Sequence, residues 1–168
     1  MDPALLKEYE SKFAEMKKRW GFQSSLDDIE SIFFVKDMIA GDKFVSEHLS
    51  RSICYRMSNL FVNWNRYLNS LMVPNPGDMI LTEEHQMIDE QDKQRAMILM
   101  SKSAELASRN SVIGLTKDAK EEGAYIDACV NHWRSELLPF LTHVMKKVNK
   151  GWHQRATSPE IVDKPGYV

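Results

Sequence analysis

The sequence lacks the segments that place a protein in or across a membrane. No apolar stretch approaches the roughly 20 residues that a helix needs to cross a bilayer. The first residues, Met1 to Glu8, have neither the basic start nor the apolar run of a signal peptide. The two cysteines, Cys54 and Cys129, lie singly within helical patterns, which is not the composition of a disulfide scaffold. We therefore expect a cytoplasmic protein with no membrane partner.

Signature motifs of common enzymes are also absent. The sequence contains no phosphate-binding glycine loop, His-Glu-x-x-His, Cys-x-x-Cys, EF-hand loop or Gly-x-Ser-x-Gly. This removes several enzyme classes and leaves open catalysis by scattered residues.

Charge is not concentrated in one sign. The formal net charge is −2, and lysines and arginines are interspersed with acidic residues. Binding to nucleic acid would require a larger, one-sided basic surface. We expect no nucleic-acid partner.

The residues that are present predict an all-α fold. Apolar residues make up 43% of the 168 residues, which is sufficient for one buried core. They recur at steps of three and four, and no strand-like alternation is found. The predicted helices cover residues 3–20, 24 or 25 to 41, 45 to about 71, 82–109 and 116–151.

Capping residues and helix breakers set these limits. Asp2 and Pro3 suit a helix start, and Gly21 suits the stop that follows. Ser24 with Asp27, or Ser25 with Asp28, has the spacing of a capping box. The other expected signals are stops at Gly41, Asn110 and Gly151, a cap at Ser46, and a loop at 73–78.

Pro139 lies inside the last predicted helix and leaves two alternatives. Either a new helix begins there, or one long helix bends. Counting both cases, we predict an up-and-down helical bundle of five or six helices over residues 1–153. Residues 154–168 show no periodicity, so we predict an extended or disordered C-terminal tail.

The strongest candidate for a metal site lies on the fifth predicted helix. His132 and Glu136 are four residues apart, so both can reach one divalent ion, and His85 and Asp89 repeat this spacing on the fourth helix. The alternative is a polar edge of the core, with His132 hydrogen-bonded or solvated. The polar residues that share this side of the fifth helix are Asp118, Glu122, Tyr125, Cys129, His132, Glu136 and His143.

A second candidate site follows the polar flank of the third predicted helix. Arginine binds carboxylates and phosphates through a two-pronged fork, which makes a small anionic ligand conceivable. Hydrogen bonds between helices are the structural alternative. The candidate ligand-binding residues are Arg51, Tyr55, Asn59 and Asn63.

Polar residues also interrupt the apolar stripe of the fourth predicted helix. His85, Asp92 and Arg95 fall on or beside that stripe. If the two charges were buried they would have to be paired, because an isolated buried charge is too costly. Otherwise the helix turns until they reach solvent.

Methionine and tryptophan point to association with another chain. There are ten methionines and four tryptophans, and Met79, Met87, Met97 and Met100 crowd the fourth helix. Flexible thioethers suit adaptable binding surfaces and also fill irregular cores. Trp152 and apolar residues of the tail could join a homodimer contact.

Two functional hypotheses follow from these observations. The first is a non-catalytic association or scaffold module that acts as a homo-oligomer, most simply a homodimer. The alternative is a metal- or small-ligand-binding bundle, which would include an enzyme, that uses the His132 and Glu136 side of the fifth helix.

Overall fold

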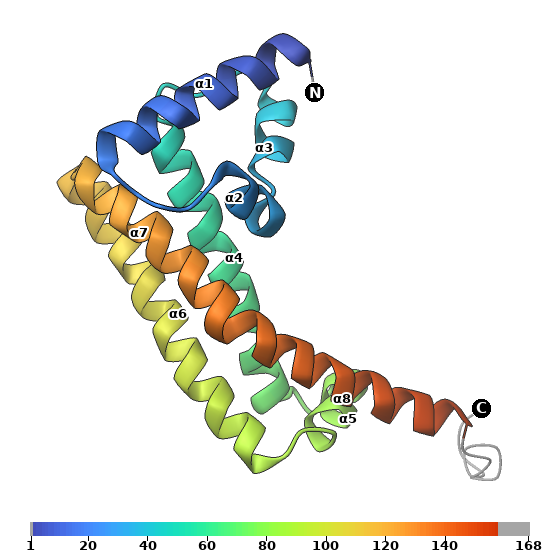
Figure 1. Cartoon of the computed structure of the whole chain (residues 1–168). Coiled ribbons are helices and arrows are strands. Elements are labelled where there is room, and N and C mark those ends of the chain that lie inside the picture. Colours follow the sequence, from blue (N-terminus) through green and yellow to red (C-terminus); the bar gives the residue numbers. More distant parts are fainter. Residues whose placement is uncertain (1, 158–168) are drawn as a thin grey trace.

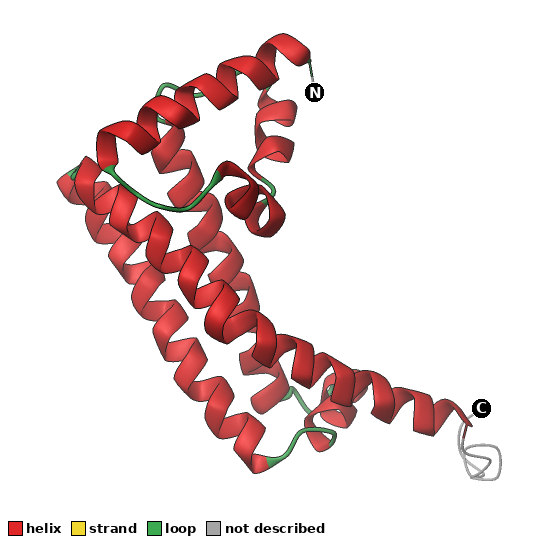
Figure 2. Cartoon of the chain, viewed as in Figure 1, coloured by secondary structure: helices red, strands yellow, loops and turns green. Residues whose placement is uncertain are grey.

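A computed structural model describes residues 2–157 of the chain. Every regular element in this range is helical (Figure 2), which confirms the predicted all-α class. None of these helices has an apolar stretch long enough to span a membrane. The elements are α1 (Pro3–Trp20), α2 (Leu26–Phe33), α3 (Val35–Asp42), α4 (Leu49–Met72), α5 (Met79–Gln86), α6 (Glu90–Thr116), α7 (Ala119–His132), the π-helical turn η1 (Trp133–Leu137) and α8 (Leu138–Thr157).

Three long helices form the centre of the molecule. α4, α6 and α7 pack side by side and alternate in direction, as the up-and-down prediction requires (Figure 1). Helices α1 to α3 cover one end of this bundle, whereas α5 and α8 lie at the other end. Ile53, Met57 and Phe61 of α4, Leu99 of α6 and Ile126 of α7 have no exposed surface and form the core between the long helices.

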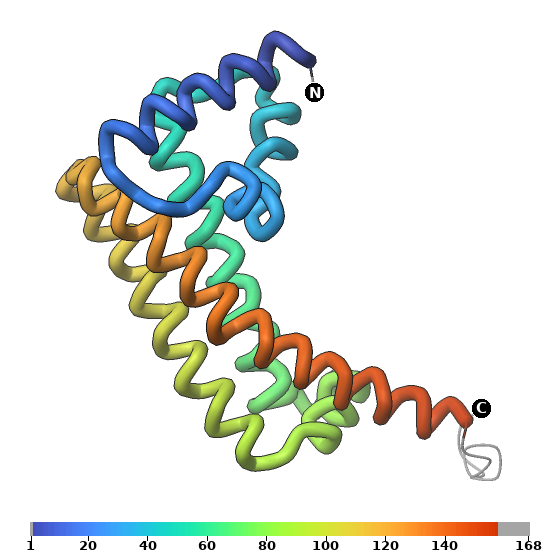
Figure 3. Tube along the Cα trace, viewed as in Figure 1, coloured from blue at the N-terminus to red at the C-terminus, as the bar shows by residue number. Residues whose placement is uncertain are grey.

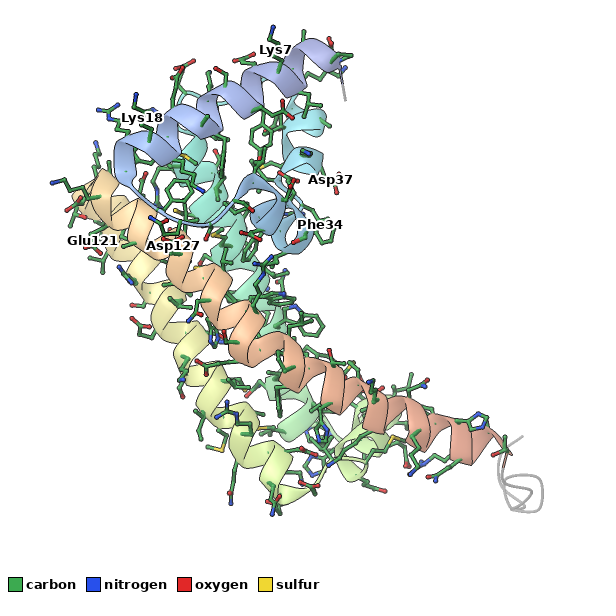
Figure 4. The ribbon with its side chains drawn as sticks, in the orientation of Figure 1. Lys7, Lys18, Phe34, Asp37, Glu121 and Asp127 are labelled. Atoms are coloured by element: carbon green, nitrogen blue, oxygen red, sulfur yellow. The ribbon has the colours of Figure 1, made fainter. Side chains whose placement is uncertain are left out.

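The number of helices exceeds the predicted five or six, because two predicted helices are each divided. The first division is at Phe34, a non-glycine residue in the left-handed conformation with φ 51°. In one unbroken helix Val35 would point away from Phe33. The break at Phe34 allows both neighbours to enter the core while Phe34 itself stays exposed (Figure 4).

The second division separates α5 from α6 at residues 87–89. Asp89 begins α6 by accepting a hydrogen bond from the backbone N–H of Asp92 at 2.9 Å. The predicted end of this helix at Arg109 is wrong, because α6 runs on to Thr116 and Asn110 is buried within it. The left-handed residue that follows α6 is Lys117.

Of the two alternatives at Pro139, the structure has the long, bent helix. α7, η1 and α8 follow one another without a break, and the tube bends where they meet (Figure 3). In η1 the N–H of Leu138 bonds to the carbonyl of Trp133, five residues earlier. Pro139 has no N–H to contribute, so this wider turn stands directly before it.

The C-terminal helix does not stop at the predicted glycine. α8 continues through Gly151 to Thr157, and a Cβ on Gly151 would overlap the side chain of Met87. Residues 154–157 of the predicted tail are therefore helical. The rest of that tail, 158–168, lies outside the described residues.

The N-terminal signals behave as predicted. Asp2 caps α1, Gly21 ends it with φ 73°, and Ser25 forms a capping box with Asp28. Asp127 of α7 then fastens the connection, accepting hydrogen bonds from the backbone N–H groups of Gln23 and Ser24 (Figure 4). These bonds hold the connection between α1 and α2 against the middle of α7.

α4 begins later than predicted and without a side-chain cap. Ser46 does not cap it, and its hydroxyl accepts from the N–H of His48 at 3.1 Å. The helix starts at Leu49, and His48 at the capping position offers its first turn no side-chain acceptor.

Candidate functional site

The first predicted metal pair, His85 and Asp89, lies where α5 gives way to α6. His85 Nδ1 is 2.9 Å from the carbonyl oxygen of Leu71, and its Nε2 is 3.3 Å from Lys93 Nζ. Asp89 caps α6 and accepts from Lys147 Nζ at 2.6 Å. This hydrogen bond with Lys147 is the main cause of the lowered pKa of Asp89.

The second predicted pair, His132 and Glu136, is divided between the core and the surface. His132 is buried, with Nε2 2.9 Å from Ser103 Oγ and its ring beside Phe61. Burial lowers the pKa of His132, which keeps its imidazole neutral. Glu136 instead accepts from Lys102 Nζ at 2.6 Å, and this bond lowers the pKa of Glu136.

The four predicted ligands thus have four different surroundings. Among residues 2–157, no three His, Cys, Asp or Glu side chains gather in an arrangement that could hold a metal ion. The alternative for His132, a hydrogen-bonded polar group at the core, agrees with its contact to Ser103.

Of the two charges that interrupt the apolar stripe of the fourth predicted helix, one is buried with a partner and the other reaches solvent. Asp92 is buried and paired, accepting from Lys147 Nζ at 2.5 Å and lying 3.1 Å from His143 Nε2. Arg95 turns outward, with half of its side chain exposed and Nη2 3.9 Å from Glu136. These contacts connect α6 to α8 and leave no charge isolated in the core.

The four predicted ligand-binding residues of α4 differ in their exposure and contacts. Tyr55 and Asn63 are exposed and Asn59 is half-buried, whereas Arg51 turns toward α6 and α7. Arg51 Nη2 lies 3.4 Å from the carbonyl oxygen of Asn110, and its Nε is 3.5 Å from Glu122.

A cavity of about 650 Å³ opens beside Arg51. One wall is Glu122, a carboxylate with 5% of its surface exposed, which accepts from Ser50 Oγ at 2.5 Å. Glu122 was expected on the polar side of its helix, but its pairing with α4 could not be deduced from sequence. The lining residues are Arg19, Trp20, Glu47, His48, Ser50, Arg51, Gly114, Lys117, Ala119 and Glu122.

The methionines divide between core and surface. Met16 and Met57 are buried, as the core alternative requires, whereas Met79 and Met97 are each about 60% exposed. Trp152 packs at the far end of the bundle, where its Nε1 donates to Glu84 at 3.1 Å. The apolar tail residues that were expected to join Trp152 lie outside the described range.

Among residues 2–157, α6 carries more exposed large apolar residues than any other helix. Met97, Ile98, Val112 and Leu115 are each at least half exposed, and Leu115 reaches 84%. Between Gln94 and Leu115 the side opposite the core carries Glu105, and the exposed Arg95 and Lys102 lie at the border of that side. We call this surface the α6 face, and its residues are Gln94, Met97, Ile98, Ser101, Ala104, Glu105, Ser108, Ser111, Val112 and Leu115.

Sequence reasoning found only Met97 of this face. The helix was expected to end at Arg109, which removed Val112 and Leu115 from its pattern. One signal in the sequence could have found the other positions. They recur at helical spacing and carry little charge, although 27% of the residues in the chain are charged.

Residues 2–157 thus form an all-α bundle with exposed apolar residues along α6 and a cavity beside Arg51. Comparisons with protein-family profiles, with curated proteins and with solved structures found no match for this chain.

Proposed function

We propose that this protein is a non-catalytic association module that forms a homodimer through the α6 face. The observation that carries the proposal is the exposed row of Met97, Ile98, Val112 and Leu115 along one long helix. Exposed apolar surface of this extent costs solubility unless another surface covers it.

The spacing of the α6 face favours a second copy of the chain as the partner. In a two-fold dimer each contact between two different residues occurs twice, once in each direction. If two α6 helices pack antiparallel about a point between Ala104 and Glu105, Met97 meets Val112 and Ser101 meets Ser108. The same register places Gln94 opposite Leu115. In this register apolar residues meet at Met97 and Val112, and small residues meet at Ser101 and Ser108.

Small side chains at the centre allow the two helices to approach closely. Ser101, Ala104 and Ser108 surround the proposed two-fold axis, and the larger apolar residues stand toward the ends. Distance between packed helices depends on the side chains at their contact. Short central side chains bring the outer apolar groups within reach of the partner helix.

A groove between α4 and α6 provides a place for Leu115 of the partner copy. The groove has a volume of about 620 Å³, and its apolar lining includes Met72, Val73, Met97 and Met100. Met97 and Leu115 are 18 residues apart (115 − 97), or five helical turns, so they lie on the same line of α6. The two-fold rotation reverses the direction of α6 but leaves this line on the same side of the helix pair. Leu115 of one copy therefore lies next to Met97 and the groove of the other copy.

The charged residues that border the face are already paired within the chain. Lys102 Nζ is 2.6 Å from Glu136, and Arg109 Nη2 is 2.8 Å from Glu121. Glu105 has no ion-pair partner in the described part of the chain. In the dimer the two Glu105 carboxylates approach near the axis, where like charges repel.

The test uses one variant that should weaken the dimer and one that should strengthen it. Leu115→Asp removes the apolar side chain that would enter the groove and should weaken the dimer about tenfold or more, the scale of an interface hot spot. Glu105→Gln removes the repulsion at the axis and should strengthen it. Sedimentation velocity over a range of protein concentrations measures both effects.

The matched control is Leu138→Asp. Leu138 is an exposed leucine of α8 outside the α6 face, so its replacement should leave the dimer constant unchanged. A wild-type chain that stays monomeric throughout, or a dimer that Leu115→Asp does not weaken, would contradict the proposal.

A further inference from the structure

The cavity beside Arg51 has the size and position of a small-molecule site. Its volume of about 650 Å³ lies within the range of roughly 300–1,000 Å³ that is usual for ligand pockets. Three parts of the chain enclose it: the C-terminal end of α1, residues 47–51 where α4 begins, and the junction of α6 with α7. The cavity therefore exists only in the folded protein.

The charge on the lining is positive once internal pairs are set aside. Glu47 is bound to Lys12 at 2.8 Å, which lies outside the lining, and Glu122 is held by Ser50 and Arg51. Two further cations, Arg19 and Lys117, line the cavity. Neither has an ion-pair partner among residues 2–157.

The first turn of α4 and two buried N–H groups lie beside the cavity. α4 begins here at Leu49 without a side-chain cap, and the carboxylate of Glu122 accepts from Ser50 in its first turn, where the helix dipole favours a negative charge. Two N–H donors of lining residues, Arg51 Nη1 and Trp20 Nε1, are buried with no acceptor within the described range. Groups of this kind can only donate. Both N–H groups belong to residues of the lining but are themselves buried, so they are not open to the cavity.

Glycine at position 114 makes room for the arginine. A Cβ on Gly114 would stand 3.2 Å from Arg51 Nη2, closer than an ordinary contact. The missing side chain lets the guanidinium lie against α6, next to the cavity. Trp20 and Ala119 give the remaining wall an apolar part.

We propose that this cavity binds a small molecule that carries a phosphate group. Arg19 and Lys117 would hold the phosphate oxygens, because arginine forks and lysine ammonium groups are the side chains that bind phosphate most effectively. The volume exceeds that of a free phosphate ion, so the organic part of the ligand occupies the side of Trp20 and Ala119.

Nuclear magnetic resonance of ¹⁵N-labelled full-length protein tests this proposal through the indole N–H of Trp20. The chain has four tryptophans, and a Trp20→Phe variant identifies the signal. The probes are phenyl phosphate, inorganic phosphate and sodium chloride, added at matched ionic strength. Phenyl phosphate should shift the Trp20 signal in a saturable manner, inorganic phosphate more weakly, and chloride not at all.

The double variant Arg19→Gln with Lys117→Gln tests the recognition of charge while keeping the Arg51–Glu122 pair intact. It should weaken phenyl phosphate binding about tenfold or more. The control is Lys7→Gln with Arg66→Gln, which removes the same charge from two exposed positions outside the cavity lining. This control should bind as the wild type does.

Three results would overturn the proposal. They are the absence of a saturable shift at Trp20, equal shifts of all four indole signals, and equal weakening by the two double variants. Inorganic phosphate that binds as tightly as phenyl phosphate would refute the organic part of the ligand. No residue of the α6 face lines the cavity, so the assay at Trp20 tests the ligand proposal separately from the dimer.

Discussion

At the scale of single residues, burial decides what the polar side chains do. His132 was grouped with possible metal ligands, yet its imidazole lies in the core against Phe61 with Ser103 as hydrogen-bond partner. Asp92 is also buried, but it keeps a charged partner in Lys147. The first group stays neutral and the second stays paired, which are the two ways to place a titratable group in a core.

The neutral state of His132 predicts a dependence of stability on pH. Because burial lowers the pKa of His132 in the folded state, the unfolded chain binds protons more readily below the ordinary histidine pKa of about 6.5. Acidification through that value should therefore reduce the free energy of unfolding. A His132→Gln variant should lose less stability than the wild type between about pH 7.5 and pH 5.5.

Urea denaturation at a series of pH values measures this difference. His153→Gln is the control, because His153 is exposed on α8 and its replacement should leave the pH profile unchanged. If the free energy of unfolding of the wild type and of His132→Gln fell equally with pH, burial of the His132 imidazole would not cause the loss of stability.

At the scale of elements, one glycine fixes how closely α1 approaches α7. A Cβ on Gly123 would be 3.0 Å from the backbone oxygen of Trp20. Backbone atoms cannot rotate away as the end of a side chain can, so the two helices would have to separate. The same contact shapes the cavity, since Trp20 is part of its lining.

Gly123→Ala should destabilise the protein by about 1–3 kcal/mol, the usual cost of overpacking. Gly41→Ala is the matched comparison, because Gly41 is also helical and has open space where its Cβ would stand. There the lower entropy of the unfolded alanine chain should stabilise the fold by about 0.4–1 kcal/mol. Chemical denaturation measures both, and a loss at Gly123 no larger than the change at Gly41 would refute the close contact.

Element boundaries show which local signals are sufficient. Asp2, Gly21 and the Ser25–Asp28 box mark real ends, because each satisfies the backbone with its own chemistry. Phe34 and Lys117 end helices in the left-handed conformation without being glycine. Tertiary packing imposes these ends, so no local residue type announces them.

At the scale of the whole molecule, the α6 face and the cavity use different parts of the bundle. The α6 face follows the outward side of one long helix, whereas the cavity forms where α1, α4 and the α6–α7 junction meet (Figure 1). The proposed dimer contact and the proposed ligand would therefore occupy separate surfaces.

A homodimer should make thermal stability depend on concentration. Because the second copy binds only the folded chain, the Tm of the wild type should rise as protein concentration increases. Leu115→Asp should flatten this dependence. Differential scanning calorimetry over a hundredfold range of concentration is the measurement, and a wild-type Tm that stays constant would contradict the dimer.

The sequence by itself determined the class of this protein and the core of its long helices. Periodic apolar residues such as Ile53, Met57 and Phe61 report one buried side of a helix wherever the other helices lie. The spacing of four that suggested a metal site at His132 and Glu136 is equally local, and it says nothing about the distance between two helices.

Only the tertiary structure decided which neighbours the polar residues meet. Arg51 was recognised from sequence as a possible anion ligand, but its contact with Glu122 joins residues far apart in the chain. The α6 face emerged in the same way, because exposure depends on which side of α6 the other helices leave uncovered. Local pattern sets what each helix can bury, and packing sets what remains available for function.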